Sequence, residues 1–145
     1  MQYEKATEGI RVLVQPRFSL ADSDPMDGTF VFSYHISMEN EGDTSAKLLF
    51  RHWLIHDSVG EDAEVDGEGV VGEQPCLSPG EGHEYRSYCV LRSPAGYMEG
   101  YYTFARPTGE RFRVEVPRFH LDGPLVLPPG FPDLDEDGDD APSMH

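Results

Sequence analysis

Apolar and polar residues alternate along much of this chain with a period of two. The alternation is clearest over residues 30–39, where aromatic and aliphatic residues occupy the even positions from Phe30 to Met38 and mostly polar residues occupy the odd ones. A period of two predicts half-buried β-strands, because successive side chains of a strand point to opposite faces. No segment shows an apolar period of 3.6 with capping residues. The expected strands are residues 10–15, 30–39, 46–56, 63–66, 82–91, 97–106 and 112–121.

Turn-forming Gly, Pro, Asp and Ser residues separate these segments at intervals of about 10 to 15 residues. Seven or eight antiparallel strands with this spacing predict an all-β sandwich. Trp53, the single tryptophan, falls near the middle of the third strand, where its large ring is expected to fill the space between two sheets. Pro117 is expected at a sheet edge or a bulge, because proline cannot donate a hydrogen bond to an interior ladder.

Residues 65–80 interrupt the strand pattern with closely spaced glycines and prolines. Gly67, Gly69 and Gly72 have the spacing of the G-x-G-x-x-G dinucleotide fingerprint, in which a helix follows the last glycine. Pro75 and Pro79 leave no room for that helix, so a Rossmann-type site is excluded. Two interpretations are left. Either the glycines shape a bulged loop that packs closely on the neighbouring sheet, which we favour, or their amides bind phosphate or pyrophosphate with the help of Arg51 or Arg86.

The chain is strongly acidic, with a net charge of −16 from 27 acidic and 11 basic residues. Such a surface repels nucleic-acid phosphates, so we expect no direct nucleic-acid binding, whereas a protein partner is compatible with it. No stretch approaches the ~18 apolar residues of a membrane span, and no export signal is seen. We therefore expect a cytoplasmic protein that does not bind membranes and keeps Cys76 and Cys89 as reduced thiols.

Two groups of residues resemble metal ligands without matching the required geometry. Residues 133–138 fit the first six positions of an EF-hand loop, but Met144 stands where the closing Glu is needed. His52 and His56 share a strand face with their Cα atoms about 13 Å apart, too far for one metal. We also expect His35 and His83 to be ordinary surface or hydrogen-bonded histidines. The sequence thus predicts no metal ligands and no cofactor.

No arrangement of nucleophile and base is visible, because Ser78 lies outside a G-x-S-x-G motif and Cys89 has no evident base nearby. We therefore expect a protein that is not an enzyme. Residues 97–104 and 111–120 combine Tyr, Phe and Arg, which anchor protein interfaces well. The residues predicted to bind a protein partner are Arg111, Arg113, Tyr101 and Tyr102.

Four blocks of the sequence resemble, in order and spacing, those of the ApaG domain family. They are residues 51–55, 65–80, 96–102 and 111–121, and the likeness extends over roughly residues 8–127. The resemblance implies an immunoglobulin-like or fibronectin type III-like β-sandwich. The family occurs alone in bacteria and as a module of eukaryotic F-box and polymerase-delta-interacting proteins. Its bacterial members are linked genetically to cobalt and magnesium resistance, and no catalytic residue is carried over.

The expected organisation is an N-terminal tip (residues 1–8), an ApaG β-sandwich domain (residues 9–127) and an acidic disordered tail (residues 128–145). The expected function is that of a non-catalytic interaction domain that binds a protein, linked by the resemblance to cobalt and magnesium homeostasis. The alternative is a small-ligand module that binds phosphate or pyrophosphate at the loop formed by Gly67, Gly69 and Gly72, with Arg51.

Overall fold

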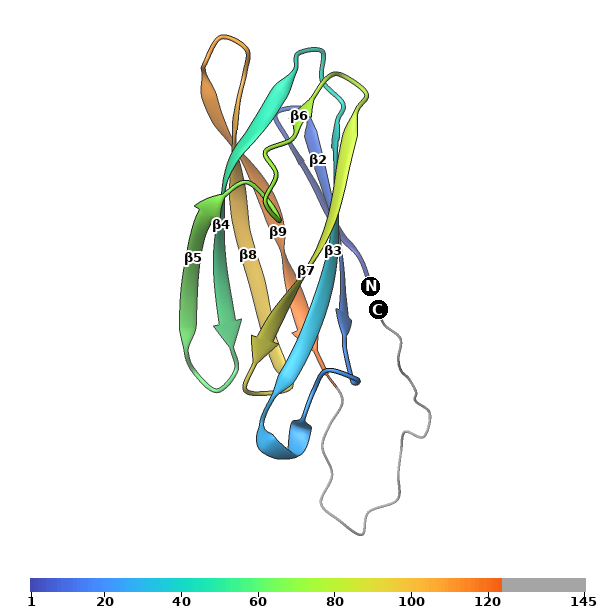
Figure 1. Cartoon of the computed structure of the whole chain (residues 1–145), viewed down its shortest axis with the longest axis vertical. Helices are drawn as coiled ribbons and strands as arrows, with labels where there is room; N and C mark the ends of the chain where they lie inside the picture. The colour runs from blue at the N-terminus through green and yellow to red at the C-terminus, as the bar shows by residue number, and fades with distance from the viewer. Residues whose placement is uncertain (124–145) are drawn as a thin grey trace.

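The computed structural model, which describes residues 1–123, is a sandwich of two antiparallel β-sheets (Figure 1). The first sheet has the strand order β1-β2-β3-β7, and the second has the order β5-β4-β8-β9, with the short β6 paired to β4. This arrangement confirms the predicted all-β sandwich. The strands are β1 (Tyr3–Thr7), β2 (Ile10–Phe18), β3 (Phe30–Asn40), β4 (Ala46–Asp57), β5 (Asp62–Glu68), β6 (Cys76–Leu77), β7 (Gly82–Leu91), β8 (Ala95–Ala105) and β9 (Arg111–Asp122).

Helical structure is minor in the described part of the chain. A single turn of 3₁₀-helix, Pro25–Asp27, lies between β2 and β3. Within residues 1–123 no helix is long and apolar enough to cross a membrane. The segment after Gly72 runs into β6 without a helical turn, as the two prolines predict.

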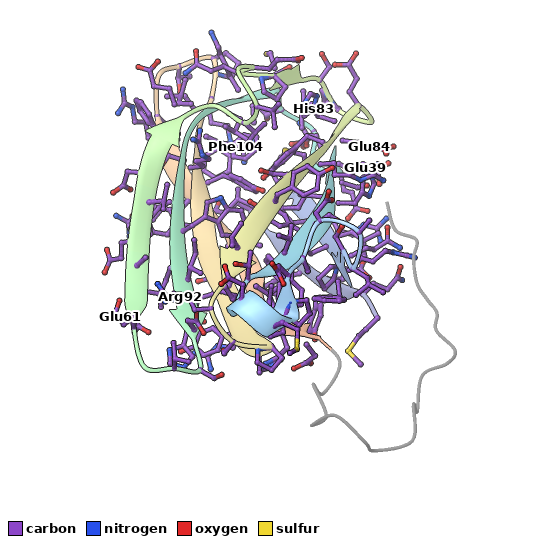
Figure 2. All side chains as sticks on the ribbon, turned by 60° about the horizontal axis from the view of Figure 1, so that its bottom comes forward. Glu39, Glu61, His83, Glu84, Arg92 and Phe104 are labelled. Atoms are coloured by element: carbon purple, nitrogen blue, oxygen red, sulfur yellow. The ribbon has the colours of Figure 1, made fainter. Side chains whose placement is uncertain are left out.

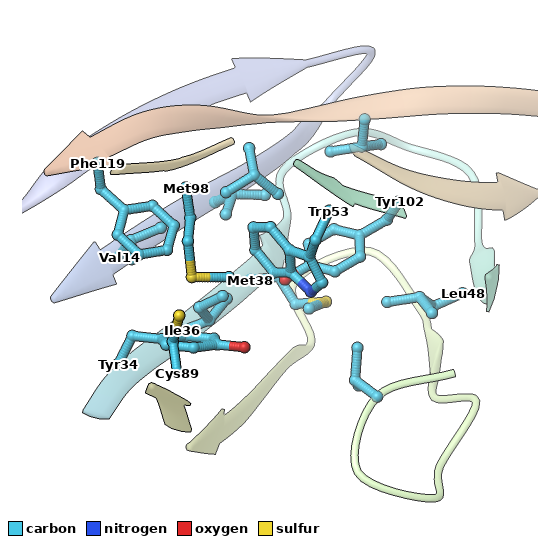
Figure 3. Packing of buried hydrophobic residues seen from close by; sticks show 14 of the residues in the cluster. Val14, Tyr34, Ile36, Met38, Leu48, Trp53, Cys89, Met98, Tyr102 and Phe119 are labelled. Carbon is cyan, nitrogen blue, oxygen red and sulfur yellow. The ribbon is translucent and has the colours of Figure 1, made fainter. Parts of the chain in front are cut away.

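The core lies between the sheets, and Trp53 stands at its centre. The indole is only 4% exposed and meets the rings of Tyr34, Phe119 and Tyr102 edge-on, at centroid distances of 5.7, 5.9 and 6.1 Å (Figure 3). Aromatic pairs favour this T-shaped geometry over face-to-face stacking. The predicted core position of the tryptophan is therefore confirmed.

A bulge in β9 explains how one strand keeps two apolar sets in the core. Met98 of β8 pairs with Phe119, and Gly100 pairs with Val116, so Pro117 and Arg118 together face a single residue. Successive side chains of a strand point to opposite faces, so one extra residue changes which positions face the core. Before the bulge the buried residues of β9 are Val114 and Val116, and after it they are Phe119 and Leu121. Pro117 thus lies both in an edge strand and at a bulge, which confirms its prediction.

The two lateral sides of the sandwich differ. On one side β1 contacts β9, through an ion pair between Lys5 and Glu115 and through the Tyr3 ring, whose centroid lies 6.4 Å from that of Phe119. On the other side β5 and β7 are the last strands of their sheets. Figure 1 shows these two edges facing the same side of the molecule, with the loop between β5 and β6 bridging them. This second side is open.

The structure has nine strands in the described part rather than seven or eight, because β1 and β6 were not predicted. Residues 3–7, predicted to lie in a tip outside the domain, form the edge strand β1 paired with β2. The turn between them places Glu8 and Gly9 at φ values of 53° and 87°, as tight hairpins require. β1 is mostly exposed, so it lacks the alternation that identifies strands. The predicted acidic tail (residues 128–145) and its EF-hand-like stretch lie outside the described residues.

Candidate functional site

The glycine-rich segment forms a loop that folds back on the second sheet. Gly69 has a φ of 63°, and Val71 and Gly72 follow with φ values of 47° and 80°. Val70 and Glu73 exchange both backbone hydrogen bonds, with N to O distances of 2.8 and 3.0 Å, across the tight turn at Val71 and Gly72. Two successive positive φ values are the mark of a type I′ turn, where Asn and Gly are favoured.

Arg51 holds this loop in place from β4. Its Nη1 donates hydrogen bonds to the carbonyl oxygens of Glu68 and Gly69, at 3.0 and 2.9 Å. The guanidinium lies so close to Gly67 that a Cβ there would sit 2.6 Å from it. A Cβ at Gly69 would sit 2.2 Å from the carbonyl oxygen of Glu73. Close packing against backbone therefore requires a glycine at position 69, whereas a side chain at position 67 would only displace the flexible Arg51 guanidinium. The packed loop is the interpretation that the sequence favours.

The same contacts bear on the predicted anion site at Gly67, Gly69, Gly72 and Arg51. The amide of Gly69 donates to the Leu49 carbonyl at 2.9 Å, and the Val70 amide is also used inside the loop. Arg51 reaches the loop but spends one nitrogen on its carbonyls, while Arg86 lies on the outer face of the first sheet. Phosphate or pyrophosphate binding at this loop stays a prediction.

Val71 carries backbone strain. A β-branched residue rarely adopts a positive φ, and here the side chain is 64% exposed, so no core packing compensates for it. Such strain costs on the order of 1–3 kcal/mol and is often found at functional sites. A residue that tolerates a positive φ better than valine is therefore expected to stabilise the protein at this position.

Val71→Asn is expected to raise the free energy of unfolding by about 1 kcal/mol, because Asn tolerates the left-handed conformation better than Val. Urea unfolding followed by the fluorescence of Trp53 measures the change. Val65→Asn, in a strand of ordinary backbone conformation, is the control and should not stabilise the protein. A Val71→Asn protein that is less stable than the wild type would show that the valine side chain contributes packing that outweighs the strain.

Beside the loop lies an apolar groove on the open side of the sandwich. It has a volume of about 350 Å³, in the range of small ligand sites, and both sheets contribute to its walls. Val65, Val71 and Tyr88 at the groove are 38%, 64% and 58% exposed, although large apolar side chains are usually covered. The lining residues are Tyr34, Arg51, Trp53, Ile55, Val65, Val70, Val71, Tyr85, Ser87, Tyr88 and Met98.

The polar groups of the groove are neutral hydroxyls and one guanidinium. Burial raises the pKa of Tyr85 above its ordinary value. The Tyr85 hydroxyl lies 2.6 Å from the hydroxyl of Tyr102. Tyr102 is fully buried, and burial raises its pKa well above the ordinary value. Burial likewise raises the pKa of Tyr34. These phenols are protonated at neutral pH, so they offer hydrogen bonds rather than acid-base chemistry.

The two cysteines are free thiols of different kinds. Cys76 in β6 is exposed, while Cys89 in β7 is buried. Burial, with a smaller contribution from the charge of Asp57, raises the pKa of the Cys89 thiol to about 11. A thiol with a raised pKa is a poor nucleophile, since the thiolate is the reactive form.

The predicted partner-binding residues separate into two groups. Tyr101, Arg111 and Arg113 belong to the outer face of the second sheet, where the Arg113 guanidinium lies 4.2 Å from the centroid of the Tyr101 ring. Tyr102 is fully buried, so its assignment to an exposed partner surface was wrong. Of two adjacent tyrosines in a strand only one can face outward.

The outer face of the second sheet carries two rows of side chains that cross all four strands. In the first row the Oδ1 atom of Asp66 lies 2.6 Å from the Nδ1 atom of His52. The His52 ring stacks on the Tyr101 ring, and the Arg113 guanidinium lies over the same tyrosine ring. The second row repeats these residue types and consists of Asp62, His56, Tyr97 and Arg118. The sequence did not predict these rows, because they depend on the register of four strands that are distant in the chain.

Each of these histidines has its own carboxylate neighbour. His52 and His56 lie beside Asp66 and Asp62, and His35 lies 2.9 Å from Glu84 on the first sheet. Among residues 1–123 no group of three or more His, Cys, Asp and Glu side chains has a metal-binding arrangement. The rows therefore have the character of surface hydrogen-bonded pairs stacked on aromatic rings.

Comparisons with known proteins agree with this fold. Residues 20–106 match the sequence profile of the ApaG domain. Protein ApaG of Rhodospirillum centenum is 45% identical over 84% of this chain and 94% of its own length, and Protein ApaG of Anaeromyxobacter dehalogenans is 47% identical over 84% and 93%. The crystal structure of the putative ApaA protein from Bordetella pertussis superimposes with a TM-score of 0.77 at 39% identity, covering 85% of this chain and 97% of that one.

Proposed function

This chain belongs to the ApaG domain family, and on that premise we propose that it is a non-catalytic, cytoplasmic interaction domain that binds an extended segment of a partner protein on its open side. The observation that carries the proposal is the apolar groove between two edge strands, with Val65, Val71 and Tyr88 exposed beside it. Exposed apolar surface next to unpaired strand edges is typical of sites that accept an added β-strand.

Of the two edges, β5 suits an added strand best. Its acidic residues alternate with smaller ones, so that Val65 and Gly67 face the groove side while Asp62, Glu64, Asp66 and Glu68 share the opposite face. An added strand places alternate side chains on these two faces. The proposed partner segment is therefore extended, with apolar residues directed into the groove and basic residues opposite the acidic ones.

The physiological part of the proposal is a link to cobalt and magnesium tolerance. It rests on family membership, and in this proposal the domain acts through its protein partner rather than by holding the metal. The neutral phenols of the groove and the raised pKa of the Cys89 thiol support a binding role over a catalytic one.

A site-specific crosslinking experiment tests the proposal. A benzophenone amino acid placed at Val65 or Val71 of the full chain, exposed to lysate of the native cell, is expected to capture the same protein at both positions. Leu20, which is 50% exposed in the loop between β2 and β3, is the matched control and should capture none of it. Adding Glu64→Lys to the Val65 variant is expected to reduce capture at least about tenfold, because it opposes like charges.

The same experiment separates the groove from the surface predicted at Tyr101, Arg111 and Arg113. The photoreactive group is also placed at Tyr101, on the outer face of the second sheet. Capture at Tyr101 without capture at Val65 or Val71 would contradict the groove and favour that surface. Equal capture at all positions, including Leu20, would show that the protein captured is not specifically bound.

A further inference from the structure

The outer face of the first sheet carries a polar hollow that shares no lining residue with the groove. Its volume is about 530 Å³, large enough for a small ligand. Strands β2, β3 and β7 form its floor, and the N-terminal residues form part of its rim. The lining residues are Met1, Gln2, Gln15, Pro16, Arg17, Ser33, His35 and Arg86.

Strand register brings two arginines to either side of a serine. Arg17 of β2 pairs directly with Ser33 of β3, and Arg86 of β7 pairs with His35, one outward position further along the same strand. Directly paired residues have Cβ atoms about 5 Å apart and diagonal ones about 7–8 Å, within reach of long side chains. Both arginine side chains are therefore long enough to reach the space above Ser33, and both line the hollow together with it.

These arginines differ from the arginine at the other end of the same sheet. Arg11 is surrounded by Glu4, Glu39 and Glu41, which neutralise it. Figure 2 shows Glu39 and Glu84 together at that end. Within residues 1–123, Arg17 and Arg86 form no ion pair. Glu84, held by His35, and Asp122 are the nearby carboxylates, and neither forms an ion pair with Arg17 or Arg86. On a chain with 27 acidic residues, two neighbouring arginines that are not ion-paired are a local positive site.

Ser33 gives a second, independent indication of a ligand. It is only 4% exposed, and its hydroxyl has no hydrogen-bond partner in the described part of the chain, although it lines the hollow. Buried hydroxyl groups are nearly always hydrogen-bonded. Next to it, the Gln15 amide nitrogen donates one hydrogen bond to Gln2 at 2.9 Å and keeps its second hydrogen, while His35 is held by Glu84 at 2.9 Å.

We propose that Arg17, Arg86 and Ser33 form a binding site for an oxyanion, a carboxylate or phosphate group, on the outer face of the first sheet. The planar guanidinium groups match the geometry of such oxyanions and donate paired hydrogen bonds to them. The Ser33 hydroxyl donates to the same group from the floor of the hollow, which satisfies a buried donor. The site is separate from the proposed protein-binding groove.

This oxyanion has two chemical sources. One is a free small molecule that carries phosphate or carboxylate. The other is the same chain, because residues 133–140 contain six acidic side chains. β9 ends at Asp122, and Asp122 and Arg17 line one adjoining cavity, so the chain leaves its described part beside the site. At about 3.3 Å per residue, residues 124–140 are long enough to reach it.

Titration of the full chain with inorganic phosphate at constant ionic strength, followed by the NMR signals of the arginine Nε–Hε groups, tests the proposal. Saturable shifts are expected at Arg17 and Arg86 and not at Arg92, an exposed arginine that forms no ion pair within residues 1–123. Ser33→Ala is expected to weaken phosphate binding about tenfold, because a hydrogen bond to a charged group is lost. Arg17→Gln is expected to abolish the saturable shift at Arg86, and Arg86→Gln is expected to abolish that at Arg17, because each site then lacks one of its two guanidinium groups.

A second full-length protein, with the six acids at 133, 135, 136, 137, 139 and 140 changed to their amides, separates the two sources. Saturable shifts in both proteins support a site for a free oxyanion. Saturable shifts only in the amide variant support a site that the chain's own carboxylates fill. No saturable shift in either protein, or equal shifts at Arg92, would overturn the proposal.

Discussion

Trp53→Ala is expected to lower the free energy of unfolding by about 3–5 kcal/mol, the range found when a large aromatic ring is removed from a core. The indole lies between the sheets, where three aromatic rings meet it edge-on. Because interiors are close-packed, the resulting cavity persists and adds to the lost transfer free energy. Urea unfolding followed by far-ultraviolet circular dichroism measures the loss.

Val90→Ala is the matched control for this substitution. Val90 is 61% exposed on β7, so its truncation should change the free energy of unfolding by less than about 0.5 kcal/mol. A Trp53→Ala protein as stable as the Val90→Ala protein would mean that the core is not centred on the indole. The packing described around Tyr34 and Phe119 would then be wrong.

Gly100→Ala is expected to cost about 3 kcal/mol or more, the upper end of the cost of overpacking. A Cβ at this position would lie 1.9 Å from the carbonyl oxygen of His52 and 3.0 Å from its carbon, both backbone atoms that cannot rotate away. β4 and β8 would have to separate at the pairing of Trp53 with Gly100, next to the bulge at Pro117. The melting temperature and the urea midpoint should both fall.

Gly42→Ala is the control for Gly100→Ala. The nearest atom to a Cβ at Gly42 is the side-chain Oδ1 of Asn40 at 3.3 Å, which needs to move only slightly. We expect this substitution to cost less than about 1 kcal/mol. If Gly42→Ala destabilised the protein as much as Gly100→Ala, the close approach of β4 and β8 would not be the reason for the glycine at position 100.

The sequence predicted those parts of the fold that depend on local pattern. Trp53 and Pro117 were placed correctly, because an apolar alternation and a missing amide are properties of single strands. The packed loop at Gly67 and Gly69 was also favoured correctly over a nucleotide-binding turn, since Pro75 forbids the helix.

Features that depend on pairing were not predictable from the sequence. Tyr102 is a different case, because it has the parity of Met98 and Phe104 in β8, so the local alternation already indicated that it faces the core. β1 was missed because its exposed residues show no alternation. The groove and the hollow around Ser33 were missed because they depend on which strands become sheet edges and which residues lie opposite one another.

In the proposed complex, the open side of the sandwich receives an added strand along β5. Residue-resolved amide hydrogen exchange of the full chain, measured with and without the protein captured at Val65, detects such a strand. Exchange in the complex is expected to be slower at the outward-facing amides of Asp62–Glu68 and in the loop at Val71, with no change along β9. Protection confined to the outer face around Tyr101, with exchange in β5 unchanged, would rule out the added strand.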